Sequence, residues 1–208
     1  EPGVSLALAQ WRAKQYREKA EGEVGQARLD KGIELLGQGL DELAGTQWAE
    51  SLSSQQFRYI LANKFLRDLD GSRRELGAKG KDIEVQVVDF NQTQAKGKLT
   101  AIRGLTLMAS LGKAEFPFPL AKMSDLELQA LIQGLGRDQD HLGYANLLMI
   151  LKRDKLAAAQ LEQAQNAPQQ AELAAKIAGP LAKTRHLHAY DFSKWQDQGD
   201  WVASEGAW

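Results

Sequence analysis

The first third of the chain carries apolar residues at helical spacing. Three stretches repeat this pattern, and turn or capping residues separate them. Gly22 and Gly25 mark the turn between the first two, whereas Ser53 and Ser54 can cap the third. The apolar positions are Leu8, Trp11 and Tyr16, then Leu29, Ile33, Leu36, Leu40 and Leu43, then Phe57, Ile60, Leu61, Phe65, Leu66 and Leu69. The pattern predicts three helices over residues 5–76, of which the second is weakened by internal glycines that each cost about 1 kcal/mol relative to Ala.

Near residue 80 the apolar period changes from helical to alternating, which is the period of a β-strand. Turn sequences interrupt the alternation at residues 91–94, at Arg103-Gly104 and at Gly112-Lys113. Pro117 and Pro119 favour an edge position, because proline cannot donate a ladder hydrogen bond. The alternating residues are Ile83, Val85, Val87, Leu99, Ala101, Leu105, Leu107, Ala109, Leu111, Ala114, Phe116 and Phe118. Four short antiparallel strands are predicted, as a meander that curls into a small barrel or packs on helices.

Helical spacing returns after residue 122. Ser124 and Glu127 form a capping box at the start of the next helix, and Asp138 or Asp140 can cap the one that follows. The apolar positions are Leu126, Leu128, Leu131 and Ile132, then Leu142, Ala145, Leu148, Met149 and Leu151, then Leu156, Ala157, Leu161 and Ala164. A last helix is predicted from Pro168 through Ile177, and Gly179-Pro180 ends it.

These periods predict an α+β fold in which helical hairpins flank a small antiparallel barrel or meander. The predicted division is an N-terminal helical segment over residues 1–76, a small antiparallel β-barrel over 77–122 and C-terminal helices over 123–183. Residues 184–208 are interpreted as a linker and the first strand of a following domain. Glu1-Pro2-Gly3 and Trp208 are unusual ends, and we expect the chain to be a piece of a longer protein.

Residues 141–168 resemble a tetratricopeptide-type helical hairpin. Small and large residues alternate there at the spacing that lets two helices approach closely, although the usual aromatic residue of the first helix is missing. The matching positions are Ala145, Leu148, Ala157, Leu161 and Ala164. Any antiparallel helical hairpin needs such positions, so an ordinary hairpin is the alternative.

Residues 82–128 are similar to the small SH3-like barrels of large multidomain bacterial proteins. The shared phrases are Gly97-Lys98-Leu99, Gly104-Leu105-Thr106-Leu107, Phe116-Pro117-Phe118-Pro119 and Ser124-Asp125-Leu126-Glu127-Leu128. In those proteins such a helix–barrel–helix region is non-catalytic and often accompanies a serine/threonine kinase domain. The resemblance therefore implies a non-catalytic region.

The C-terminal segment from Tyr190 is rich in aromatic residues and has no helical period. Tyr190-Asp191-Phe192, Trp201 and Gly206-Ala207-Trp208 resemble the first strand of a concanavalin-like jelly roll. The alternative is that the tryptophans fold back and dock on the helices, because each buries a large apolar area. On the docking interpretation, Trp195 and Trp201 are buried against the C-terminal helices.

Composition narrows the classes of function. The formal net charge of the 208 residues is −1, which does not suggest a nucleic-acid binder. Cysteine is absent, which excludes disulfides, thiol nucleophiles and cysteine-ligated metals. No apolar run approaches the roughly 18 residues of a membrane span.

Motifs of catalysis are also missing from the sequence. There is no nucleophile elbow, phosphate-binding loop or kinase catalytic motif. His186, His188 and Asp191 could begin a metal site with His141 elsewhere, but polar linker residues are the better explanation. The Asp138–Asp140 pair is better explained by helix capping than by acid–base catalysis. A local basic patch precedes the strands without interleaved aromatic residues, so it does not indicate nucleic-acid binding: Arg67, Arg73, Arg74, Lys79 and Lys81.

The sequence therefore predicts no enzyme, no cofactor, no catalytic residues and no metal site. We expect a non-catalytic interaction or scaffold region of a larger bacterial multidomain protein, with a signalling role as one option. Its expected partners are proteins or neighbouring domains of the same chain, neither nucleic acid nor membrane. The alternative is a ligand- or carbohydrate-binding module that continues through the tryptophan-rich tail. The sequence does not identify the binding residues.

Overall fold

The computed structural model of the chain describes residues 2–88, 94–167 and 170–171. The elements follow in the order α1 (Pro2–Gly25), α2 (Leu29–Glu42), α3 (Gln47–Ala78), β1 (Glu84–Val88), β2 (Gln94–Arg103), β3 (Thr106–Leu111), β4 (Ala114–Pro119), a 3-10 turn η1 (Leu120–Lys122), α4 (Asp125–Gly134), α5 (His141–Ile150) and α6 (Asp154–Asn166). The α+β prediction is confirmed: helices precede and follow one antiparallel sheet along the chain. No helix in this part of the chain is both long and apolar enough to cross a membrane.

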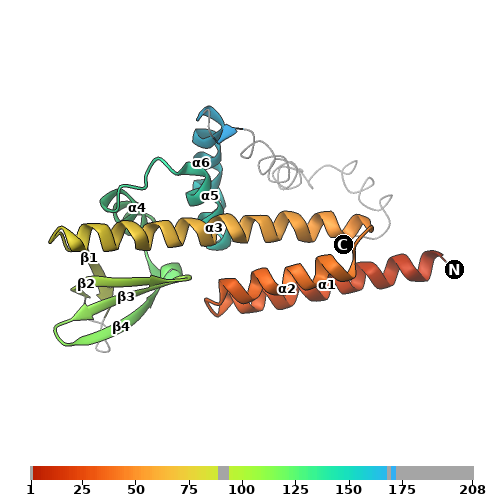
Figure 1. Cartoon of the computed structure of the whole chain (residues 1–208), viewed down its shortest axis with the longest axis horizontal. Coiled ribbons are helices and arrows are strands. Elements are labelled where there is room, and N and C mark those ends of the chain that lie inside the picture. The colour runs from red at the N-terminus through yellow and green to blue at the C-terminus, as the bar shows by residue number, and fades with distance from the viewer. Residues whose placement is uncertain (1, 89–93, 168–169, 172–208) are drawn as a thin grey trace, which may run out of the picture.

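Helix α3 is the spine of the molecule. Figure 1 shows the α1–α2 hairpin along one half of α3 and the sheet beside the other half, with α4, α5 and α6 on the opposite side of the spine. Contacts of α3 with α1, α2, β2 and α5 support this arrangement. The three predicted folded segments consequently share one continuous hydrophobic core, which extends from Ala13 to Ala157. The predicted domain boundaries themselves stay a prediction.

The sheet is an open meander in the order β1-β2-β3-β4. Its tight turns lie where the sequence predicted them, and both use a glycine with positive φ, Gly104 at 54° and Gly112 at 64°. Strand β4, which carries both prolines, is an edge strand as predicted. Of the two predicted forms of the sheet, the meander is therefore the one present. Residues 91–93 of the third predicted turn lie outside the described residues, and Gln94 already belongs to β2.

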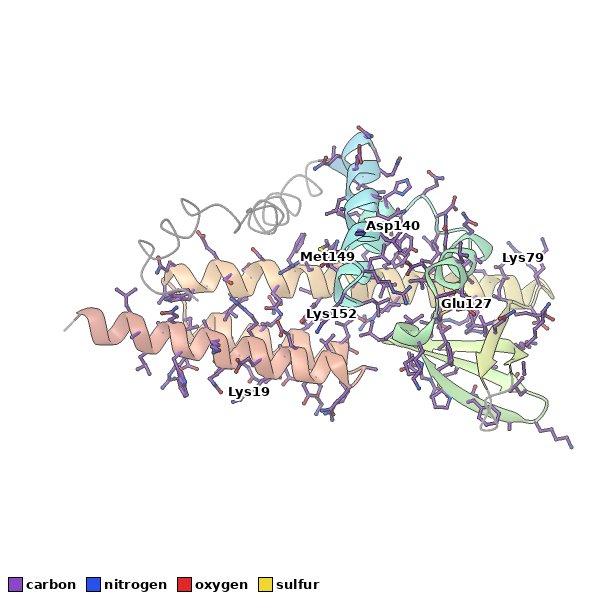
Figure 2. All side chains as sticks on the ribbon, turned by 180° about the vertical axis from the view of Figure 1, so that it is seen from behind. Lys19, Lys79, Glu127, Asp140, Met149 and Lys152 are labelled. Carbon is purple, nitrogen blue, oxygen red and sulfur yellow. The ribbon has the colours of Figure 1, made fainter. Side chains whose placement is uncertain are left out.

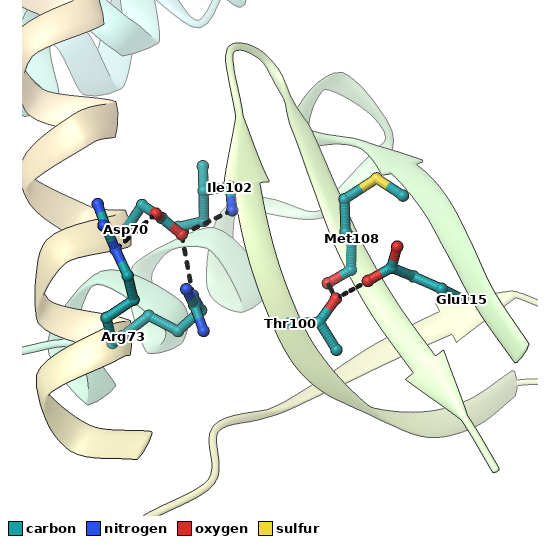
Figure 3. Close-up of polar contacts among 7 residues, drawn as sticks. Asp70, Arg73, Thr100, Ile102, Met108 and Glu115 are labelled. Atoms are coloured by element: carbon teal, nitrogen blue, oxygen red, sulfur yellow. Dashed lines mark hydrogen bonds and ion pairs between the residues drawn. The ribbon is translucent and has the colours of Figure 1, made fainter. Parts of the chain in front are cut away.

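A β-bulge at Thr100 changes the alternation in β2. Leu99 pairs with Ala109 whereas Ala101 pairs with Met108, so one residue of β2 has no partner. The bulge leaves Ala101 only half-buried and turns Ile102 into the core, with 7% of its surface exposed. The prediction that Ala101 lies on the same buried face of the sheet as Leu99 is therefore wrong. The unpaired residue shifts the alternation by one, so that the residues after it point to the opposite face. The Thr100 hydroxyl donates to the Met108 carbonyl at 3.0 Å (Figure 3).

The same bulge connects the sheet to the spine. The Ile102 amide donates to the Asp70 carboxylate of α3 at 3.0 Å, and Arg73 donates to the same oxygen at 2.9 Å (Figure 3). Arg74 contacts the other Asp70 oxygen at 3.1 Å. Burial acts to raise the pKa of the Asp70 carboxyl, but these hydrogen bonds and the two arginine charges outweigh it, so that its pKa lies below the ordinary value.

The predicted caps of the C-terminal helices are confirmed. The Ser124 side chain accepts from the Glu127 amide at 3.3 Å, and the Glu127 carboxylate accepts from the Ser124 amide at 2.7 Å, which completes the capping box. Asp140 caps α5 by accepting from the Gly143 amide at 3.0 Å. Helices α5 and α6 form the predicted hairpin, and its small and large positions are all buried: Ala145, Leu148, Ala157, Leu161 and Ala164. Of the helix predicted from residue 168 to 177, the structure describes only residues 170–171, and the tail from 184 lies outside the described residues.

Several apolar positions predicted for the core are exposed instead. They are Leu8 and Trp11 on α1, Phe57 and Ile60 on α3, and Leu126 on α4, which is 79% exposed. The buried face of α1 consists largely of small residues, Ala13 and Ala20. Helical spacing indicates that residues share a face, but the neighbours of the helix determine which face is covered.

The glycines of α2 permit close contact with α1. A Cβ at Gly39 would lie 2.7 Å from the Tyr16 ring, and a Cβ at Gly32 would lie 2.7 Å from a Val24 methyl group. Both glycines are buried inside a continuous helix. Their helix-propensity cost is therefore offset by the packing of α1, and the second helix forms as predicted despite them.

Candidate functional site

A groove of about 600 Å³ lies beside the middle of α3, where four parts of the fold meet. Its walls come from the C-terminal part of α1, the first half of α3, the sheet and the η1 turn that follows β4, and the end of α5 with its connection to α6. Figure 2 shows Met149, near the end of α5, and Lys152, in that connection, beside the middle of α3, between the α1–α2 hairpin and the sheet. This volume suits a small ligand or a short peptide segment.

The floor of the groove is a buried polar pair on α3. Gln55 and Tyr59 are each 7% exposed, and the Gln55 carboxamide donates to the Tyr59 hydroxyl oxygen at 2.9 Å. Gln55 also donates to Glu21 of α1 at 3.2 Å. Burial raises the pKa of the Tyr59 hydroxyl, so the side chain stays neutral at physiological pH. The floor therefore offers hydrogen-bonding groups within an otherwise apolar packing layer.

Positive charge predominates in the groove. Arg17, Arg58 and Lys152 line it together with a single carboxylate, that of Glu21. Arg17 donates to the Ser51 hydroxyl, and Arg58 donates to the Ser54 carbonyl at 3.3 Å. None of these three cations forms an ion pair within the described part of the chain.

Arg58 is the most constrained of these cations. Its side chain is half-buried, and this burial lowers the pKa of the guanidinium from its ordinary value. Tyr59 and Glu21 act in the opposite direction, whereas the neighbouring charge of Arg17 lowers the pKa further. The guanidinium nevertheless stays charged, because its pKa begins far above neutrality. The groove thus holds a partly desolvated charge that, among the described residues, donates only to the Ser54 carbonyl.

The remaining wall of the groove is apolar. Val24 and Leu105 are 8% and 6% exposed, and Pro119, Met149 and Ile150 complete the surface. These residues come from α1, the sheet and α5, so only the tertiary fold brings them together. A ligand that fits this groove has an aliphatic part beside a polar or charged part.

Two strained backbone positions border the groove. Ala27 and Lys152 are the non-glycine residues with positive φ in the described chain, at 62° and 58°. Each follows a helix whose last carbonyls accept hydrogen bonds from the residues after it, from Arg28 to Glu23 at 2.9 Å and from Arg153 to Leu148 at 2.9 Å. This is the Schellman helix end, where glycine is favoured. Strained positions of this kind concentrate at functional sites.

The groove has hydrogen-bonding and ionic groups but no arrangement for nucleophilic catalysis among its described residues. It contains no histidine, and Gln55 stands between its one carboxylate, Glu21, and the Tyr59 hydroxyl. The Ser51 hydroxyl accepts from Arg17, which cannot act as a base.

The residues weighed from sequence as sites do not gather in this groove. His141 contacts the Gln160 side chain at 2.9 Å through Nδ1, and Asp140 is a helix cap. Within residues 2–88, 94–167 and 170–171, no group of three histidine or acidic side chains could hold a metal ion. His186, His188 and Asp191 lie outside those ranges.

The predicted basic patch is largely involved in ion pairs. Arg73 and Arg74 bind Asp70, and Arg67 lies 3.6 Å from Asp30. Lys79 and Lys81 are exposed at the end of α3. Two of these ion pairs lie within α3 itself, and the Arg67–Asp30 pair joins α3 to α2.

Sequence reasoning missed Gln55, Arg58 and Tyr59. Gln55 and Tyr59 are one helical turn apart and follow Leu52 on the same face of α3. A polar residue at a buried position of this face was the feature of the sequence that could have indicated the site. No pattern in the sequence indicated that Arg17 and Lys152 would line the same groove as this turn of α3. No protein-family model, curated protein or solved structure matches this chain.

Proposed function

We propose that this chain is a non-catalytic interaction module that binds a segment of a partner protein, or of a neighbouring domain, in the groove beside α3. The observation that carries the proposal is the combination, in one groove, of an aliphatic wall with three cations that have no ion-pair partner among the described residues. Such a surface is suited to recognising a side-chain pattern.

The architecture supports a role as a rigid support for binding. The α3 helix, 32 residues long, holds the α1–α2 hairpin, the sheet and the α5–α6 hairpin at set positions along one axis. Because every wall of the groove is attached to a different element, the groove is defined by how these elements pack. The resemblance of residues 82–128 to non-catalytic regions of bacterial multidomain proteins agrees with this proposal, including the signalling option.

Carbohydrate recognition was the alternative interpretation. It depended on aromatic residues from Tyr190 onward, and these lie outside the described residues. Nothing in the described groove favours sugar binding over peptide binding, because its one lining aromatic side chain, Tyr59, is buried rather than presented for stacking.

A library of short displayed peptides selected on the whole chain tests the proposed function. We expect selection of peptides that bind the wild-type chain and lose binding when Ala121→Trp fills the groove, since Ala121 is exposed and lines it. Lys113→Trp is the matched control, because Lys113 is exposed in the turn between β3 and β4 and does not line the groove. Selected peptides that bind both variants equally, or a failure to select any, would contradict a peptide-binding groove.

A further inference from the structure

The inference below rests on the proposed function and concerns the chemistry of the ligand. We propose that the groove recognises an acidic side chain next to an aliphatic one in a protein segment, with Arg58, Arg17 and Lys152 binding the acid and the wall around Leu105 holding the aliphatic residue.

The first argument is the balance of charge. Three cations and one carboxylate line the groove, and the carboxylate of Glu21 already accepts from Gln55. Arg58 and Arg17 each use a donor on a neutral oxygen, of Ser54 and Ser51 respectively. A guanidinium has five donors in a planar fork, which leaves room for paired hydrogen bonds to a carboxylate.

The second argument is burial. Arg58 is half-buried on α3, and no carboxylate of the described residues forms an ion pair with it. The more distant charge of Glu21 offsets only part of the loss of hydration, because burial still lowers the pKa of the guanidinium. A partly buried charge of this kind is unfavourable until an opposite charge reaches it. An acidic ligand group would provide that charge, so binding gains more from Arg58 than from an exposed arginine such as Arg67, which pairs with Asp30.

The third argument concerns Lys152. Its φ of 58° is a conformation that glycine adopts more readily, and Gly80 and Gly136 occupy the equivalent positions after α3 and α4. Lysine at this position places a positive charge on the groove at a cost in backbone energy. The strain and the charge thus coincide at the proposed binding surface.

The shape of the groove favours a protein segment over a nucleic acid. Leu105, Val24 and Met149 form an aliphatic wall directly beside the cations. Single-stranded nucleic acids are bound by tracks of cations with aromatic side chains that stack on bases, and Tyr59 at 7% exposure cannot serve in that way. The wall instead suits leucine-, isoleucine- or valine-like side chains.

The experiment compares three libraries of displayed peptides that share aliphatic positions and differ only at the others. One library carries Asp and Glu there, the second carries Asn and Gln, and the third carries Lys and Arg. We expect groove-dependent binders only from the acidic library, with affinity that falls as salt concentration rises. Groove-dependent binders from the neutral or basic library would overturn the ligand chemistry while leaving the interaction module intact. If no library yields binders that Ala121→Trp abolishes, the proposed function fails as well.

Variants of single cations then test the assigned residues. Arg58→Met and Lys152→Gly should each weaken binding of the selected acidic peptide by about tenfold or more, as expected for losing a charge-assisted contact. Arg67→Met on the exposed side of α3 is the matched control and should change the affinity by less than about twofold. Neither groove variant should lower the thermal unfolding midpoint, because one removes a partly buried charge and the other removes backbone strain. Unchanged affinity in both groove variants would overturn the assignment.

Two competitors distinguish other anionic ligands. Inorganic phosphate should displace the acidic peptide only weakly, because it leaves the aliphatic wall empty. A single-stranded oligothymidine should not compete at physiological salt. Displacement by phosphate as effective as by the peptide, or tight groove-dependent binding of the oligonucleotide, would contradict recognition of an acidic protein segment.

Discussion

The two halves of α3 differ in what they bury. The second half buries large apolar side chains, among them Phe65, Leu66 and Leu69, against the sheet and α5. The first half buries Leu52 but also the polar pair Gln55 and Tyr59, and it faces the groove. The buried surface of the second half of α3 therefore contributes mainly to stability. The surface of the first half leaves hydrogen-bonding and ionic groups available to a ligand.

The two halves of α3 therefore differ in whether they contribute to stability or to binding. Close packing of apolar groups contributes most to the free energy of unfolding, whereas a partly buried charge without a partner opposes it. We therefore expect substitutions of the buried apolar residues in the second half to lower the free energy of unfolding, and substitutions of the groove cations Arg58 and Lys152 to leave it unchanged or raise it. The following predictions run from the largest expected effect to the smallest.

Phe65→Ala tests the apolar half most strongly. Phe65 is 1% exposed, and its ring centroid lies 6.1 Å from that of Tyr144. We expect a loss of about 3–5 kcal/mol in the free energy of unfolding, measured by urea denaturation, because the substitution leaves a cavity. Phe57→Ala on the same helix is the control: Phe57 is 37% exposed, so its loss should be below about 1 kcal/mol. Similar losses for both would show that the apolar face of α3 is wrongly assigned.

Gly143→Ala tests the closeness of α5 to the spine. A Cβ at Gly143 would lie 2.8 Å from the Phe65 ring, so α5 must move and we expect a loss of about 1–3 kcal/mol. Gly71→Ala in α3 is the matched control, because nothing lies within 4 Å of a Cβ there. That substitution should raise stability by up to about 1 kcal/mol through helix propensity. Urea midpoints that move in the same direction for both variants would contradict the close contact.

Asp70→Asn tests the connection between α3 and the bulge in β2. We expect a loss of about 1–2 kcal/mol at neutral pH, since hydrogen bonds to a charged group are lost and partial exposure screens the ion pairs. The pKa of Asp70 is lowered in the folded state, so its contribution is complete above the unfolded value of about 3.9 and disappears as the pH falls through the folded value. Wild-type and variant stabilities should therefore converge in acid, as measured by unfolding at a series of pH values. A difference that persists at low pH would show that the Asp70 charge is not responsible.

Lys152→Gly tests the groove half. Removing the strain at a φ of 58° should raise the free energy of unfolding by about 1 kcal/mol, even as it weakens peptide binding. Gly136→Ala is the reciprocal control, because Gly136 has a φ of 66° at the end of α4 and should lose about 1 kcal/mol. Thermal unfolding of both variants measures the two shifts. A Lys152→Gly chain that is less stable than wild type would show that Lys152 has a structural role.

Local signals in the sequence predicted local features correctly. The turns at Gly104 and Gly112, the edge position of β4 and the capping box at Ser124 all depend on interactions within a few residues. Such interactions are decided by residue types at short spacing. The hairpin of α5 and α6 was predicted from the spacing of small and large residues within residues 141–168, and its two helices follow one another directly along the chain.

The errors involve neighbours that are distant along the chain. Trp11 and Ile60 belong to apolar patterns but are 57% and 43% exposed, because no described element covers those faces. Gly39 lowers the helix propensity of α2, yet its lack of a side chain is what lets Tyr16 of α1 approach α2 closely. The bulge at Thr100 reverses the facing of Ile102, and the Ile102 amide donates a hydrogen bond to Asp70, 32 residues earlier.

The sequence by itself determined the order and type of the described elements, the turns at Gly104 and Gly112 and the caps of α4 and α5, because each depends on backbone preferences and periodicity over a few residues. The predicted cap of the third helix at Ser53 and Ser54 is wrong, because α3 already begins at Gln47. Only the tertiary structure decided which helix faces are buried and that Arg17, Arg58 and Lys152 line one groove. The physical reason is that burial and the effect of burial on charge depend on contacts between α1, α3 and the end of α5. The groove thereby brings together residues more than 90 positions apart in the chain, such as Arg58 and Lys152.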